Sequence, residues 1–425
     1  MENTPIEQPF QKWNNFDTAW TLSLYGTAIG AGILFLPIQL GLGGLLPVLI
    51  MSIITFPLIF FAHRNVARFV LAGIKASDDI IEVTKQNFSS RFTNFFATIY
   101  FLSIFPIIMI YGIALTNNIL NVLVKLLGWS TPSRWWIALL IISSLILLVN
   151  FGKEITIKIM SLLVFPLIAF LFLFSVAMIP NWNFAILETL SFSYVSPIES
   201  HNSLFKALLL SFPIMVFAFN HMAVISSFTV SYKEKYGKIV ERKISKTQIL
   251  AVALMVFTAA FFVFSCVMVL GPKELFIAKT NNVSVLDYLA IYLHNPAIKY
   301  IASAVAFVAV VTSFIGVYFG TQEALKYFFT CIYKTKTITV ANKTIKISTA
   351  VTVFILVWAS ATYNLSIIAT LLNILGPVLA FMLFIFPLIA IYTIPTLYKY
   401  KSFIPDSFIL IIGLCSMYIA VVSLF

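Results

Sequence analysis

The sequence predicts an all-α polytopic membrane protein with eleven transmembrane helices. We expect two inverted five-helix units, each with a broken first helix, and one extra C-terminal helix. Three observations support this fold class. Long stretches lack Asp, Glu, Lys and Arg, the basic residues between them gather on one side, and the first and sixth spans are interrupted near their middles.

Composition agrees with a membrane protein. The 425-residue chain is 61% hydrophobic and 10% charged, with a mean hydropathy of +1.01, whereas soluble proteins carry about 25% charged residues. The net charge of +12 is therefore not a nucleic-acid footprint. We predict one membrane domain, residues 18–425, after a polar cytoplasmic tail, residues 1–17, that has neither a signal-peptide nor a transit-peptide pattern.

The uncharged windows define the spans. A helix needs about 20 residues to cross a bilayer. The first and eighth windows are about twice that length, and each has a break near its middle, at residues 41–44 and 362–364. Dividing these two gives eleven spans. The windows are residues 18–62, 92–124, 135–152, 159–187, 207–232, 247–272, 300–322, 347–398 and 407–425.

The basic residues orient the chain. With the N-terminus in the cytoplasm and one crossing per span, 21 of the 27 basic residues lie on the cytoplasmic side. The reverse orientation would violate the positive-inside rule. The odd number of spans then places the C-terminus outside.

Two spans carry residues that interrupt a membrane helix. The first has three glycines within seven residues, Gly26, Gly30 and Gly32, and each costs about 1 kcal/mol relative to alanine in a helix. Either they form a small-residue packing face, or the helix unwinds and exposes N–H and C=O groups to a ligand. The sixth span holds Asn220 and His221 in an apolar stretch, and such polar groups are usually functional.

Breaks at the first and sixth of eleven spans indicate an inverted repeat. In secondary transporters, paired breaks at corresponding positions of the two repeats mark the substrate site. Repeat one covers about residues 18–180, repeat two about 203–398, and the extra helix about 406–425. The N-terminus of a half-helix favours a carboxylate, and free carbonyls favour an ammonium group. Together they fit a zwitterion such as an amino acid.

Other polar residues within the spans have two interpretations each. Thr312 and Ser313 either bond back to their own helix or form an oxygen cage for Na⁺. Glu323 either pairs with Lys326 at the cytoplasmic end or relays protons. His221, the only histidine we expect deep in a span, either packs or contacts substrate and protons.

Two further residues and the cysteines complete the candidates. Lys158 either extends to the membrane interface or takes part in ion coupling, and Tyr111 either packs or offers its hydroxyl to the site. The three scattered cysteines predict no disulfide. The four histidines lie far apart, and the chain has no HExxH, no GxSxG and no paired carboxylates in the spans. We therefore expect no enzyme and no cofactor.

Long motifs also carry a resemblance. The stretches GTAIGAGILFLPIQLGLGG at 26–44, PIMVFAFNHMAVISSF at 213–228 and GPVLAFMLFIFPLIAIY at 376–392 resemble the bacterial hydroxy/aromatic amino acid permease family, and its serine/threonine branch most closely. This family belongs to the amino acid–polyamine–organocation superfamily. The resemblance implies the eleven-helix inverted-repeat fold and import of a small amino acid by symport, with alternating access, in the bacterial inner membrane.

The resemblance also implies a site. The carboxylate-binding turn falls on Gly30, Ala31 and Gly32. Backbone carbonyls would receive the ammonium group, and three side chains would discriminate between substrates. The carbonyls are those near Tyr25, Gly26, Phe217 and Phe219, and the side chains are Tyr111, Asn220 and His221. A sodium site would use carbonyls of Gly26, Ile29 and Ala309 and hydroxyls of Thr312 and Ser313.

Two positions depart from the family pattern. Many members have Lys where this chain has Thr312, and a lysine there suits H⁺ coupling, whereas threonine restores an oxygen site for Na⁺. Both coupling ions therefore stay open. After the Asn-x pair of the sixth span, members often read Ser-Pro-Ile, and here the chain reads Met-Ala-Val from Met222. The alternatives for function are an aromatic amino acid permease of the same family and, from another class, a channel.

Overall fold

The computed structural model describes residues 12–130, 132–188, 204–281, 283–333, 338–364 and 375–422, and within these ranges the chain is helical with no strand. Among its described residues, the first part of the chain forms nine helices. They are α1 (Asn15–Ala28), α2 (Leu36–Gly41), α3 (Leu45–Leu71), α4 (Ile80–Asn87), α5 (Ser90–Asn121), α6 (Arg134–Asn150), α7 (Lys153–Met178), α8 (Ala185–Glu188) and α9 (Leu204–Ala218).

The second part continues in the same way and ends in a span over Leu375–Thr393 followed by a terminal helix. Its helices are α10 (Met222–Tyr236), α11 (Val240–Thr280), α12 (Val285–Tyr292), α13 (Pro296–Tyr333), α14 (Ile338–Tyr363), α16 (Phe386–Thr393, within that last span) and α17 (Phe403–Val422). Within α11 the backbone departs from helical geometry at Gly271, whose φ of +67° suits glycine.

Among the described residues, seven helical segments are long and apolar enough to cross a membrane, or eight if a bent pair at the N-terminus counts as one span. Two further apolar helices are shorter, Arg134–Asn150 and Phe403–Ile419. The protein is therefore an integral membrane protein by length and composition.

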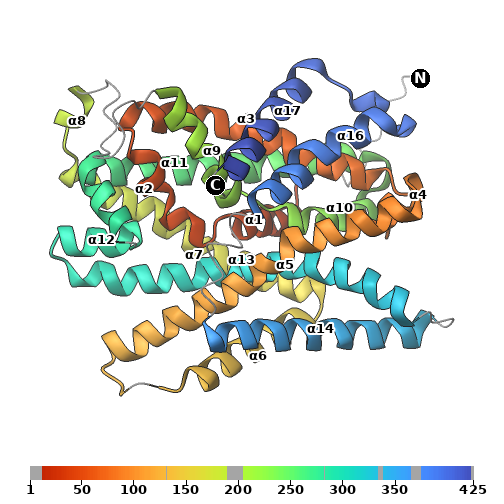
Figure 1. Ribbon diagram of the computed structural model, residues 1–425, viewed down its shortest axis with the longest axis horizontal. Coiled ribbons are helices and arrows are strands. Elements are labelled where there is room, and N and C mark those ends of the chain that lie inside the picture. Colours follow the sequence, from red (N-terminus) through yellow and green to blue (C-terminus); the bar gives the residue numbers. More distant parts are fainter. Residues whose placement is uncertain are drawn as a thin grey trace, which may run out of the picture.

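The long helices run roughly along the long axis of the molecule (Figure 1). Helix α13 packs along α5, and α14 packs on α5 and α6 on one side of the molecule, whereas α3, α16 and α17 gather on the other. Helix α1 lies between these groups and contacts α7, α10, α11 and α13. The short helices α4 and α12 lie at opposite ends of the long axis (Figure 1).

Both predicted breaks are present. Helix α1 ends at Ala28 and a 3-10 turn (Ala31–Leu34) leads into α2, with a bend of 57° across the pair. In the second break, α9 ends at Ala218 and α10 begins at Met222. Pro213 stays inside α9, so the interruption lies at the aromatic and polar residues that follow it.

Candidate functional site

The break in the first span leaves a carbonyl that a side chain satisfies. The amide of Gly30 donates to the carbonyl of Ala28 at 2.9 Å, and so does not reach the carbonyl of Gly26 four residues back. The hydroxyl of Ser313 on α13 donates to that Gly26 carbonyl instead, at 3.0 Å. A helix break and a hydroxyl predicted from sequence are therefore in direct contact.

Gly30 lies where a side chain would not fit. A Cβ built on Gly30 would lie 2.5 Å from Oγ of Ser313 and 3.4 Å from the hydroxyl oxygen of Tyr111 on α5. Tyr111 is buried. Glycine at this position lets the unwound backbone approach α13 and α5 closely.

The two breaks face each other. A Cβ built on Gly32 would lie 3.3 Å from Cα of Ala218 and 3.3 Å from the ring of Phe217, both at the end of α9. Ala31 and Gly32 open the 3-10 turn, so their amide groups have no acceptor within it. This close approach places the start of the 3-10 turn in one break against the end of the half-helix α9 at the other.

The remaining predicted residues of the first span are buried beside the same helices. Tyr25 and Ile29 are buried, but the hydroxyl of Tyr25 bonds Thr258 on α11 at 2.9 Å, so its side chain points to α11. Thr312 lies 3.1 Å from a Cβ built on Gly26, yet its hydroxyl donates to the Ala309 carbonyl at 3.0 Å. Back-bonding to its own helix therefore describes Thr312 in this structure.

The break in the sixth span is held by side chains. Oδ1 of Asn220 accepts the amide of Met222, the first residue of α10, at 3.0 Å. Phe219 is buried, and Nδ1 of His221 lies 3.0 Å from the Phe219 carbonyl. Nε2 of His63 on α3 accepts the amide of His221 at 3.2 Å.

The expectation that the histidines lie apart is wrong for this pair. The rings of His63 and His221 stack with centroids 3.6 Å apart and planes 5° apart, and both residues are fully buried. Helix α3 runs on to Leu71, so His63 lies well inside a helix rather than at the end of a span. Their separation of 158 positions in sequence hid the contact.

Glu323 contacts other helices rather than its neighbour Lys326. Its carboxylate accepts the hydroxyl of Ser227 on α10 at 2.8 Å and lies 3.4 Å from the hydroxyl oxygen of Tyr100 on α5. Lys326 instead pairs with Asp79 at 3.2 Å. Glu323 therefore joins α13 to α10 and α5.

These groups border a cavity of about 480 Å³. Its wall combines acidic, basic and hydroxyl side chains from the loop before α4 and from α7, α10, α13 and α14. The polar members are Ser77, Asp79, Lys153, Ser227, Gln322, Glu323, Lys326, Lys346 and Thr349.

The loop that leads to Asp79 is fixed by its neighbour Asp78. Burial raises the pKa of Asp78, but hydrogen bonds from Gln86 and from the Lys75 amide outweigh it and hold the pKa below the usual range. Asp79 itself caps α4 by accepting the amides of Ile81 and Glu82. The wall of the cavity is therefore ordered by two adjacent carboxylates.

Lys158 is not brought to the other predicted residues. It is exposed on α7, which fits the interface interpretation. Lys153 of the same helix turns inward instead, and its ammonium donates to the Ser227 carbonyl at 2.8 Å.

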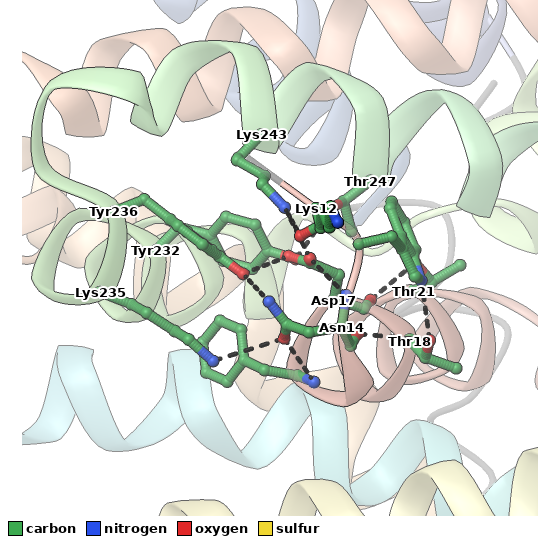
Figure 2. Close-up of polar contacts among 12 residues, drawn as sticks. Lys12, Asn14, Asp17, Thr18, Thr21, Tyr232, Lys235, Tyr236, Lys243 and Thr247 are labelled. Atoms are coloured by element: carbon green, nitrogen blue, oxygen red, sulfur yellow. Dashed lines mark hydrogen bonds and ion pairs between the residues drawn. The ribbon is translucent and has the colours of Figure 1, made fainter. Parts of the chain in front are cut away.

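Sequence reasoning also missed a polar cluster at the start of α1, shown in Figure 2. Asp17 is fully buried and lies 2.9 Å from Nζ of Lys243 on α11. Tyr232 and Tyr236 of α10 donate to its other oxygen at 3.0 and 2.7 Å. The charges could have been read from the sequence, but not their contact across more than 200 positions.

Comparison with relatives defines the class of protein to which this chain belongs. Residues 19–423 match the tryptophan/tyrosine permease family, so the chain belongs to that family of membrane permeases. The predicted family resemblance is confirmed, and so is the prediction that the chain is a transporter rather than an enzyme, because its relatives carry transporter names.

The individual relatives are similar over nearly their whole length. The chain is 40% identical to the serine transporter SdaC of Escherichia coli K12 over 97% of this chain and 96% of that protein. It is 35% identical to the threonine/serine transporter TdcC of Escherichia fergusonii over 95% of each chain.

Solved structures share the fold. A manganese transporter from Eremococcus coleocola superposes with a TM-score of 0.60 at 13% identity, covering 97% of this chain and 88% of that one. A nucleobase-cation-symport-1 family transporter in a closed conformation gives 0.56 at 12% identity, covering 96% and 91%.

Proposed function

We propose that this protein imports L-serine or L-threonine across the bacterial inner membrane by symport with H⁺ or Na⁺ and alternating access. The observation that carries the proposal is the approach of the two helix breaks, with Gly32 against Ala218 and Phe217. Free amide groups at such a junction suit the carboxylate of an amino acid. The names of the relatives at 35–40% identity support the substrate class.

The topology we propose has eleven crossings. The helical stretch Ser211–Thr280 has 70 residues, which at about 1.5 Å per residue far exceeds a bilayer core of about 30 Å. The positive φ of Gly237 between α10 and α11 supports a turn there, and so two crossings. With this stretch counted as two crossings, the seven long segments give eight, and the bent pair, α6 and α17 bring the number to eleven. The N-terminus would be cytoplasmic and the C-terminus outside.

The polar cavity beside Glu323 fits the cytoplasmic vestibule in this orientation. Its lysines, Lys153, Lys326 and Lys346, lie on segments that the positive-inside rule assigns to the cytoplasm. A mixed-charge wall offers partners to both ends of a zwitterion. Substrate would leave between α10 and α13 when the Ser227–Glu323 contact opens.

Uptake in proteoliposomes tests the proposal. Labelled L-serine is supplied with an imposed Na⁺ gradient or an acid-outside pH gradient, one at a time, and with excess L-threonine, L-tryptophan or L-tyrosine as competitors. We expect one gradient to drive accumulation and threonine to compete. Competition by the aromatic amino acids alone would favour an aromatic permease, the second candidate that the family description supports. Unsaturable flux would indicate a channel.

A further inference from the structure

We propose that the stacked pair of His63 and His221 binds the co-transported proton, a site that rests on the proposed symport. His63 lies on α3 and His221 in the break before α10. The pair therefore joins one helix to the interrupted backbone that approaches the substrate turn of the first span.

Hydrogen bonds fix the proton positions on both rings. A backbone N–H can only donate, so Nε2 of His63 must present a lone pair to the amide of His221. His63 then carries its proton on Nδ1 and donates to the Ile59 carbonyl at 2.8 Å. His221 likewise donates from Nδ1 to the Phe219 carbonyl. Both rings are neutral in this arrangement.

One nitrogen is left to accept a proton. Nε2 of His221 is buried and has no hydrogen-bond partner within the described part of the chain. A proton from the outside solution would bind to this lone pair without breaking either existing hydrogen bond, and would leave to the cytoplasm from the same atom. The ring would then carry a positive charge in a fully buried place.

No carboxylate within the described ranges contacts either ring to balance that charge. The carboxylate of Glu241 on α11 pairs with Arg68 of α3 at 3.8 Å instead. Asp406 of α17 accepts the Tyr392 hydroxyl of α16 at 3.2 Å.

The other titratable groups nearby are also engaged elsewhere. Arg64 of α3 lies over the rings of Phe60 and Phe61. Tyr25 of α1 bonds Thr258, and Tyr232 of α10 bonds Asp17. Among the described residues, the titratable group that faces the ring of His221 is therefore the neutral ring of His63.

The lack of a partner for a charged His221 would couple proton binding to substrate binding. A buried charge is costly unless it is paired, and the carboxylate of an amino acid held at the neighbouring break would be its partner. Proton and substrate would each favour binding of the other, which is the reciprocal relation that symport requires. His63 acts as the positioning residue, because its lone pair holds the amide of His221 in place.

Two substitutions separate the loss of a proton-binding nitrogen from the loss of the hydrogen bonds that the two rings make. The amide oxygen of Gln in His63→Gln can accept the His221 amide where Nε2 now does. The amide nitrogen of Asn in His221→Asn can donate to the Phe219 carbonyl as Nδ1 does. Neither side chain takes up a proton. His294→Asn, at an exposed position with a φ of +49° that Asn tolerates, is the matched control.

Serine accumulation driven by an acid-outside gradient and serine counterflow without any gradient are measured in proteoliposomes. We expect the ratio of pH-driven accumulation to counterflow to fall at least tenfold in His221→Asn, which removes the open Nε2. The ratio should stay within about threefold of wild type in His63→Gln, which keeps an acceptor for the His221 amide, and in the control. An unchanged ratio in His221→Asn, an equal fall of the ratio in His63→Gln, or accumulation driven by Na⁺ alone would overturn the inference. Absence of counterflow in the wild-type protein would instead refute the proposed function.

Discussion

The carboxylate of Asp17 and the ammonium group of Lys243 lie 2.9 Å apart, with side chains 0% and 5% exposed. This ion pair fastens the first turn of α1 to α11, and Tyr232 and Tyr236 add α10 to the same carboxylate (Figure 2). Three helices that flank the two breaks are thereby joined at one end. They should move together as one body during transport.

Breaking this pair should destabilise the protein strongly. Lys243→Met would leave a buried carboxylate without its cation, and the loss of one partner of a buried pair costs about 3–5 kcal/mol. We expect the free energy of unfolding in detergent to fall by that amount. The double variant Asp17→Asn with Lys243→Met should recover part of the loss, because no unpaired charge remains.

The exposed pair of Glu82 and Lys85 provides the control. Its charged atoms lie 3.8 Å apart and its side chains are 41% and 62% exposed, so Lys85→Met should cost only about 0–1 kcal/mol. Equal effects of Lys243→Met and Lys85→Met would show that burial does not give the Asp17 pair its strength.

Ser313→Ala should weaken transport through the first break. The substitution removes the donor to the Gly26 carbonyl and leaves that buried oxygen unsatisfied, at a cost of about 1–3 kcal/mol. We expect the KM for L-serine to rise about five- to tenfold, since this range corresponds to a factor of about 5 to more than 100 in binding and water offsets part of it. Uptake kinetics in proteoliposomes provide the measurement.

Ser144→Ala is the matched control for that variant. Ser144 is exposed on α6 and its hydroxyl bonds back to the Leu140 carbonyl at 2.8 Å, so its loss should leave KM unchanged. A KM for Ser313→Ala within a factor of two of wild type would mean that this hydroxyl does not support the substrate turn.

Both helix breaks could be predicted from the sequence because the residues that cause them lie within the interrupted spans themselves. Glycines and polar residues in an apolar span disfavour a helix whatever surrounds them, and the structure interrupts the helices beside Gly30 and at Asn220. The contact of Ser313 with the Gly26 carbonyl joins two residues that the family resemblance placed in one sodium site.

Long-range pairing could not be read from the sequence. His63 looked like a residue at a helix end, because Arg64 follows it and closes the uncharged window. Packing carries α3 past these charges to Leu71 and buries His63 against His221. Glu323 seemed to belong with Lys326 one turn away, but Ser227 and Asp79 on other elements are the partners observed. Spacing along a chain does not reveal such contacts.

Gly30→Val should abolish serine uptake while the protein is still made and inserted. The new side chain would overlap Oγ of Ser313, which lies 2.5 Å from the Cβ position, and would displace the unwound turn. We expect uptake to fall at least tenfold, with a membrane yield like that of wild type. Ala297→Val, on an exposed face of α13, should leave uptake unaltered. Normal uptake by Gly30→Val would exclude the proposed carboxylate turn.

The native cysteines test the proposed orientation. Cys331 is exposed on α13, Cys415 is partly buried and Cys266 is fully buried, so a membrane-impermeant maleimide should react mainly at Cys331. With a cytoplasmic N-terminus, Cys331 should be labelled in inside-out vesicles and protected in intact cells. Ser130→Cys in a Cys331→Ser background should show the opposite pattern, because Ser130 is exposed on the loop before α6, which we place outside. Labelling of Cys331 from outside would reverse the topology, and with it the assignment of the Glu323 cavity to the cytoplasmic side.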